Sequence, residues 1–201
     1  MRFGKPADEL GPERIYAFSD GVFSIIITIM VLELKRPASA SFHSLLELWP
    51  TWLGYAVSYV FIAIVWMNHH FLMRFIGSTR LSLMWANFAH LFCVSLIPFL
   101  TEWLSDSRLE AVPVAMYAFD FLLVNITYLW LVRETLGDGA DGKVPATSRH
   151  MLHLRSFISI VLFTAAMIIA FWLPCLGFGL IVCCLVLYLR PEIPPKTKHL
   201  S

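Results

Sequence analysis

The residues from Ser156 to Leu189 read SFISIVLFTAAMIIAFWLPCLGFGLIVCCLVLYL, without a single Asp, Glu, Lys or Arg. An apolar run of about 18 residues or more is typical of a membrane-spanning segment. Pro174, Gly177 and Gly179 lie near the middle of this run. Because proline removes a backbone donor and glycine favours a chain reversal, we expect two short helices joined by a tight turn.

The whole chain has the composition of a membrane protein. Its 201 residues are 58% hydrophobic and 14% charged, with a mean hydropathy of +0.71. Soluble domains are about 45–50% apolar and about 25% charged. The net charge of +1 and the lack of a basic run argue against a nucleic-acid partner.

Charges, prolines and glycines divide the chain into six apolar segments, each close to the ~20 residues that cross ~30 Å of hydrocarbon. The expected helices run near 15–34, 48–73, 82–104, 112–132, 151–172 and 175–189. No internal repeat is visible. We therefore predict an all-α membrane protein with six transmembrane helices, forming a single domain over residues 1–201.

The Lys and Arg residues predict how these helices are oriented. With six helices, both termini share one side with the second-to-third and fourth-to-fifth connections. That side carries 12 of the 15 Lys and Arg residues, and the other carries only Lys35, Arg36 and Arg108. By the positive-inside rule, both termini are cytoplasmic in a multi-pass protein of the plasma or inner membrane.

The sequence predicts neither signal-peptide cleavage nor a disulfide framework. Ala38-Ser39-Ala40 resembles a signal-peptidase site, but the apolar stretch before it is too long and Lys35 and Arg36 lie on the wrong side, so no cleavage is expected. The four cysteines lack the spacing of a disulfide framework and are expected to be packed thiols. They are Cys93, Cys175, Cys183 and Cys184.

The most specific pattern lies in the first helix, where Arg14-Ile15-Tyr16-Ala17-Phe18-Ser19-Asp20 precedes GVFSIIITIMVLEL. An Arg and an Asp entering an apolar helix are costly in lipid and must be paired or hydrated. The pattern R-x-x-x-F-S-D resembles the signature of the lysosomal potassium channel family (transmembrane protein 175), and the single six-helix unit is similar to its prokaryotic branch. Further resemblances are Trp66-x-x-His69-His70 and Trp85-x-Asn87 with Pro98-Phe99-x-Thr101.

This resemblance implies a homotetramer in the lipid bilayer that conducts potassium through a pore lined by the first helix. It implies no carbonyl selectivity filter, and the sequence contains no segment like T-V-G-Y-G. A chain of this size also needs a symmetric oligomer to enclose a pore. No cofactor and no other protein partner are implied. The family's pore-facing positions correspond here to Ile25, Thr28, Ile29 and Leu32.

On a helical wheel, Phe18, Val22, Ile25, Ile29 and Leu32 share one stripe. Periodicity alone would assign such a stripe to packing or lipid contact. Because it coincides with the family's pore positions, we predict a pore face. Ile25 is expected to form the narrowest constriction, which excludes water when closed.

Asp20 lies about 140° from Ile25 on the wheel, so it is expected to point into the subunit. Arg14 lies about 120° from Asp20, which makes a direct intrahelical pair awkward. We therefore predict a network in which His69, or alternatively His70, bridges the two. Because adjacent histidines point about 100° apart, no metal site is expected from this pair.

The remaining polar residues are expected to have structural roles. Asn87 and His90 are three residues apart and are expected to face one partner helix, while Asp120 and Asn125 are expected to be helix-packing groups. For Glu33, at the outer end of the first helix, two alternatives stay open. It could form a ring that concentrates cations, or it could pair with Arg36.

An enzyme is not expected, since no nucleophile motif, zinc motif or phosphate loop is present. The alternative to a potassium channel is a proton-coupled secondary transporter or proton-leak pathway, because Asp20 with a histidine could relay protons. Transporters usually contain internal repeats and broken helices, and neither is evident.

Overall fold

The computed structural model describes residues 11–76, 79–137 and 146–188. Those residues form helices without any strand, as expected for an all-α protein. The helices are α1 (Pro12–Leu32), α2 (Phe42–Leu46), α3 (Trp49–Met73), α4 (Leu81–Ser95), α5 (Ile97–Asp106), α6 (Ala111–Leu136), α7 (Ala146–Ala170) and α8 (Pro174–Tyr188).

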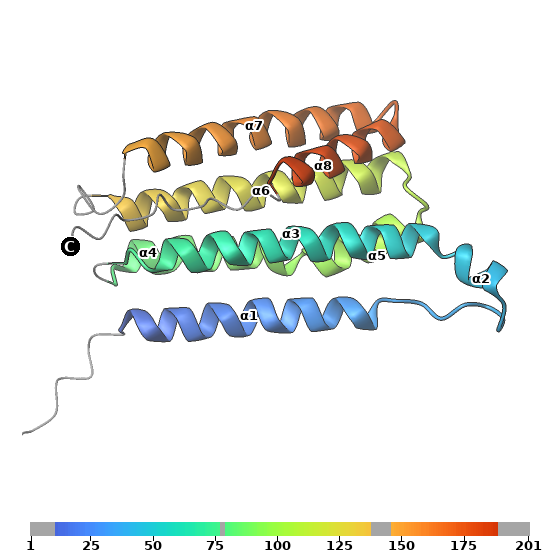
Figure 1. Cartoon of the computed structure of the whole chain (residues 1–201), viewed down its shortest axis with the longest axis horizontal. Helices are drawn as coiled ribbons and strands as arrows, with labels where there is room; N and C mark the ends of the chain where they lie inside the picture. The colour runs from blue at the N-terminus through green and yellow to red at the C-terminus, as the bar shows by residue number, and fades with distance from the viewer. Residues whose placement is uncertain (1–10, 77–78, 138–145, 189–201) are drawn as a thin grey trace, which may run out of the picture.

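The long helices lie side by side in an elongated bundle, with α1 along one edge and α7 and α8 along the opposite edge (Figure 1). The start of α1, the end of α3, the start of α4, the end of α6 and the start of α7 lie at one end of the bundle. The α1–α3 connection, the α5–α6 turn and the α7–α8 turn lie at the other end. Successive connections between the long helices thus lie at alternating ends of the bundle, as expected for a chain that crosses a membrane repeatedly.

Within the part of the chain that the structure describes, four segments are long and apolar enough to cross a membrane, namely residues 12–32, 49–73, 81–106 and 111–136. Two shorter apolar helices cover 154–170 and 174–186. At 1.5 Å per residue, the 15 residues of α8 span about 22 Å, less than the ~30 Å of a hydrocarbon core. The long spans match four of the six expected helices closely, while α7 and α8 occupy the place of the other two.

The expected third helix, 82–104, is interrupted at Leu96 and forms α4 and α5. Pro98 lies in the first turn of α5. Its ring has no N–H for the carbonyl of Val94 and clashes with that carbonyl, which breaks a continuous helix at this point. The short helix α2 was not predicted. The Ser41 hydroxyl caps α2 by accepting a hydrogen bond from the Ser44 amide at 3.2 Å.

The expected reversal within 156–189 is confirmed, because α7 ends at Ala170 and α8 begins at Pro174. The two helices pack closely at Gly177. A Cβ atom at this position would lie 2.8 Å from the Ala166 carbonyl oxygen, closer than real Cβ contacts allow. Glycine is therefore required here by the approach of the two helices.

The core of the subunit lies between α3 and α6 and is covered by α7 and α8. The rings of Phe61 and Phe121 stack with centroids 3.6 Å apart, and Phe163 meets both edge-on. Beside this cluster the Ser58 hydroxyl makes hydrogen bonds of 2.6 Å to Thr101 and to Tyr117. These polar contacts join α3, α5 and α6 where no water competes.

Candidate pore-lining surface and its supporting network

One face of α1 is left uncovered by the rest of the subunit. The exposed fractions of Ile25, Ile29 and Leu32 are 57%, 39% and 80%, and Thr28 is also exposed. All four predicted pore residues therefore lie on the uncovered side of the helix. In a monomer this location fits lipid contact, packing against another subunit or a pore wall.

The opposite face of α1 is buried against α3 and α4 and carries Ile15, Ser19, Phe23, Ile26 and Met30. Four of these five side chains are apolar, and Ser19 is the buried polar one. The buried stripe fixes the rotation of α1 within the subunit, and so determines that Ile25 points outward.

Ser19 belongs to a buried hydrogen-bonded chain that links three helices. The Asn87 side-chain amide of α4 donates to the Ser19 hydroxyl at 3.0 Å, and the Asn87 carbonyl oxygen lies 2.8 Å from His69 Nε2 of α3. All three residues are buried. Since an amide oxygen only accepts, His69 must carry its proton on Nε2. This chain holds α1, α3 and α4 at a fixed separation.

Asp20, the neighbour of Ser19, takes a different partner from the one predicted. The indole Nε1 of Trp66 donates to Asp20 Oδ1 at 2.9 Å, while His69 turns to Asn87. The predicted Arg14–Asp20–histidine bridge is therefore wrong as a direct contact. Trp66 lies almost one helical turn before His69 on α3, and in the observed packing it is the indole that reaches the carboxylate.

Arg14 and His70 lie apart from this network. Arg14 is exposed and, within the described residues, forms no ion pair with Asp20. It lines an open pocket together with Phe18 and Phe88, whose rings meet edge-on at 5.5 Å. His70 lies against Trp66, with ring centroids 5.4 Å apart, and its Nε2 is 3.3 Å from the Arg74 guanidinium.

Asn87 and His90 are both buried and both contact His69 of α3, which agrees with the structural role expected of them. Asn87 bonds to α1 and α3, whereas His90 Nδ1 lies 3.2 Å from the Thr127 hydroxyl of α6. The rings of His69 and His90 are parallel, with centroids 5.9 Å apart.

Asp120 is buried, and neither of its carboxylate oxygens has a hydrogen-bond partner among the described residues.

The outer end of α1 is charged. The Lys35 ammonium bonds both carboxylate oxygens of Asp106 at 2.5 and 2.6 Å, and this hydrogen bond raises the pKa of Lys35. Glu33 lies beside Glu102. Partial burial and the Glu102 carboxyl raise the pKa of Glu33. The described residues contain no Glu33–Arg36 ion pair, so this alternative is wrong, while the proposed ring of Glu33 stays untested.

The described cysteines form no disulfide, and Cys93 and Cys184 are buried as packed thiols. Cys175 and Cys183 are exposed on the surface of the bundle. Within residues 11–76, 79–137 and 146–188, no group of three His, Cys, Asp or Glu side chains is arranged to hold a metal ion.

Sequence reasoning missed the role of Trp66, although the residue was noted in the W-x-x-H-H pattern. The available signal was the spacing: residues three apart on α3 share a face, so Trp66 and His69 were both candidates to meet the first helix.

Comparison with known proteins agrees with this architecture. Residues 14–98, from the first helix to the start of α5, match the family described as endosomal/lysosomal potassium channel TMEM175. A potassium channel of Chryseobacterium sp. (strain P1-3) is 35% identical over 182 residues, covering 89% of this chain and 93% of that protein. A zebrafish (Danio rerio) endosomal/lysosomal proton channel TMEM175 is 30% identical over 155 residues, which cover 65% of this chain and 30% of that longer protein.

Among solved structures, the crystal structure of a lysosomal potassium-selective channel TMEM175 homolog from Chamaesiphon minutus superposes with a TM-score of 0.75. The two chains are 28% identical, and the match covers 89% of this chain and 96% of that one.

The apolar helices and the match to this family and its solved structure define an integral membrane protein of the ion-channel class, and not an enzyme. The chain belongs to the TMEM175 family.

Proposed function

We propose that this chain is a potassium-conducting channel, built as a homotetramer of a single six-helix domain over residues 1–201, in which four copies of α1 surround the pore. The observation that carries the proposal is the uncovered face of α1, which carries Ile25, Thr28, Ile29 and Leu32. The buried face of the same helix packs against the subunit and fixes the rotation of α1. The bacterial relatives named as potassium channels support potassium as the permeant ion.

Ile25 is proposed to form the narrowest point of this pore, with Ile29 and Leu32 further out. Four isoleucine side chains that meet on an axis exclude water, and such a constriction gates conduction by dewetting. Ions would pass largely hydrated when the helices spread slightly. α1 is continuous from Pro12 to Leu32, so its carbonyls are engaged within the helix, which supports a pore without a carbonyl filter.

The channel is proposed to lie in the plasma or inner membrane with both termini cytoplasmic. This orientation is supported by the uneven distribution of Lys and Arg, because the helix ends that carry Arg74, Arg80 and Arg133 lie at the end of the bundle where α1 begins.

Current through planar bilayers that contain the purified protein tests the constriction. If Ile25→Asn lowers the dewetting barrier by about 1.4 kcal/mol, conductance should rise about tenfold. Ile126→Asn is the matched control, because Ile126 is 46% exposed on α6, away from α1. Unchanged or lower current in Ile25→Asn, or an equal rise in both variants, would remove Ile25 from this role.

A proton-leak pathway is the second candidate, and the zebrafish relative named as a proton channel favours it. Flux into liposomes separates the two functions. A potassium channel gives potassium flux without a pH gradient, whereas a proton pathway acidifies the lumen without potassium, and a coupled transporter requires both ions.

A further inference from the structure

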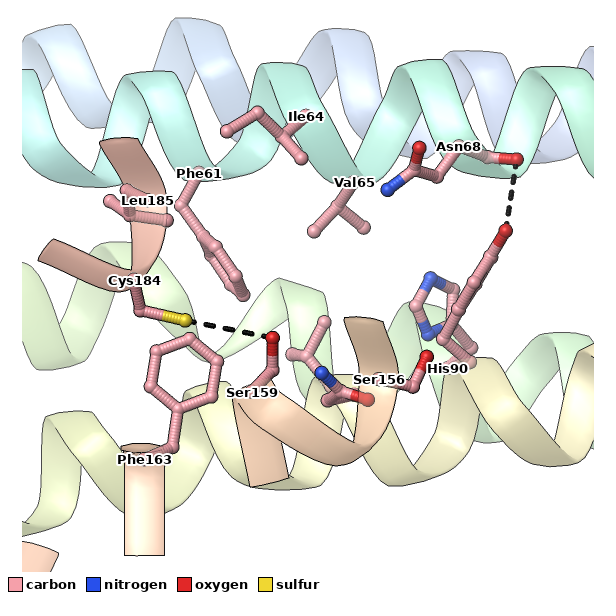
Figure 2. Close-up of a pocket in the computed structure, with 13 residues that line it drawn as sticks. Phe61, Ile64, Val65, Asn68, His90, Ser156, Ser159, Phe163, Cys184 and Leu185 are labelled. Atoms are coloured by element: carbon pink, nitrogen blue, oxygen red, sulfur yellow. Dashed lines mark hydrogen bonds between the residues drawn. The ribbon is translucent and has the colours of Figure 1, made fainter. Parts of the chain in front are cut away.

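A partly open cavity of about 50 Å³ lies between the helices of the subunit and is not lined by any residue of α1 (Figure 2). Its apolar walls come from α3, α6, α7 and α8. The polar residues that line it include His90 of α4, Asn125 of α6 and Ser156 of α7. The cavity is therefore separate from the proposed pore.

Two buried acceptor atoms at this cavity have no hydrogen-bond partner among the described residues: His90 Nε2 and Asn125 Oδ1. The state of His90 follows from its neighbour. The Thr127 hydroxyl donates to the backbone carbonyls of Leu123 and Val124 at 2.8 and 3.0 Å, an arrangement in which it accepts from His90 Nδ1. With its proton on Nδ1, the neutral ring leaves a lone pair on Nε2.

A cavity with two unpartnered acceptors fits a small molecule that donates two hydrogen bonds. A cavity needs at least about 10–15 Å³ to hold one water, which needs two to four polar partners, so this cavity is large enough to hold water. We propose that the cavity is a water-binding site, in which ordered waters donate to His90 Nε2 and Asn125 Oδ1.

These waters would complete a polar path through the subunit. His90 is stacked on His69, which is hydrogen-bonded to Asn87 and through it to Ser19 of α1. On the far side, Ser156 and Ser159 belong to α7, and Ser159 accepts a hydrogen bond from the Cys184 thiol of α8 at 3.5 Å. The hydrated cavity would thereby join the α7–α8 pair to the helices that hold α1.

Crystals of the purified protein, with and without xenon pressure, provide the direct test, because dry apolar cavities bind xenon and polar hydrated ones stay filled with water. We expect density for water within hydrogen-bonding distance of His90 Nε2 and Asn125 Oδ1, and no xenon. Xenon in the cavity, or a cavity without water density, would overturn the proposal. Neither result depends on which ion the protein conducts.

A pair of variants tests the same site without a crystal. Ser156→Val places extra apolar volume in the cavity and displaces water, whereas Ser156→Ala does not. If the cavity is hydrated, the valine variant should melt at a lower temperature than the alanine variant, because two buried acceptors lose their donors. A melting temperature equal to or above that of Ser156→Ala would contradict hydration, since filling a dry cavity improves packing.

Discussion

The indole Nε1 of Trp66 donates a hydrogen bond of 2.9 Å to Asp20 Oδ1. The adjacent residue, Ser19, is hydrogen-bonded to Asn87, which in turn is hydrogen-bonded to His69. The signature segment of α1 is thus attached to α3 and α4 at two adjacent residues. Since residues 19 and 20 point in different directions, the two contacts together restrain rotation of α1 about its axis.

The Trp66–Asp20 contact predicts energetic coupling between the two residues. In a double-mutant cycle of Trp66→Phe and Asp20→Leu, we expect a coupling energy of about 0.6–1.7 kcal/mol, the range for interhelical hydrogen bonds in membranes. Unfolding of the detergent-solubilised protein measures it. Trp172→Phe, at an indole that is 74% exposed, serves as the control. If the double variant loses the sum of the unfolding free energies lost by the two single variants, the hydrogen bond has no energetic role.

The same contact predicts a milder effect of Asp20→Asn. Asparagine keeps an oxygen that accepts from the Trp66 indole, so this variant should retain more stability than Asp20→Leu. The melting temperatures of Asp20→Asn and Asp20→Leu, measured under the same conditions, test this prediction. If they are equally destabilised, the carboxylate charge matters and the indole contact does not.

The buried chain predicts a larger loss at its centre. Asn87→Leu leaves the Ser19 hydroxyl and His69 Nε2 without their shared partner, which should cost about 1–3 kcal/mol of unfolding free energy. Phe88→Leu changes the neighbouring residue, which is 42% exposed, and is expected to cost less. A loss at Asn87 no greater than the loss at Phe88 would contradict the importance of the chain.

The α7–α8 contact predicts opposite effects at two glycines of the same helix. Gly177→Ala places a Cβ 2.8 Å from the Ala166 carbonyl oxygen and should destabilise the protein by about 1–3 kcal/mol. Gly179→Ala meets no atom within 4 Å and should stabilise α8 by up to about 1 kcal/mol, because alanine favours helix more than glycine. Melting temperatures that shift in the same direction would show that the helices are not closely packed at Gly177.

The outer end of α1 predicts a pH dependence. Partial burial and the Glu102 carboxyl raise the pKa of Glu33 above its ordinary value of 4.5, so the folded protein binds a proton there more readily than the unfolded chain. Stability from this group therefore falls as pH rises from the ordinary pKa through the raised one. Glu33→Gln should raise the free energy of unfolding near neutral pH. This stabilisation should disappear at pH values below the ordinary glutamate pKa of 4.5. A benefit that is independent of pH would contradict this assignment.

The long helices were predictable because lipid forces each spanning segment to satisfy its backbone internally, so apolar length and charged breaks indicate helices directly. The interruption at Leu96 was less visible, since Pro98 lies inside an otherwise continuous apolar segment. α2 is only five residues long and carries no apolar periodicity.

The site was predictable only in part, for a geometric reason. The wheel of α1 separates Ile25 from Asp20, and in the structure Ile25 is exposed while Asp20 bonds to Trp66 within the subunit. The partner of Asp20 depends on how α3 is rotated and shifted against α1, which no single-helix pattern contains. Trp66 and His69 share a face of α3, and only the packing assigns the indole to Asp20 and the imidazole to Asn87.

The central claim is that the uncovered face of α1 lines a potassium-conducting pore. The most direct measurement is the reversal potential of current through the purified protein in a planar bilayer, with potassium on one side and an equal concentration of sodium on the other. We predict a reversal potential displaced toward the potassium equilibrium potential. This displacement is expected when the pH is equal on the two sides of the bilayer. A reversal potential of zero, or one that follows an imposed pH gradient instead of potassium, would contradict the account.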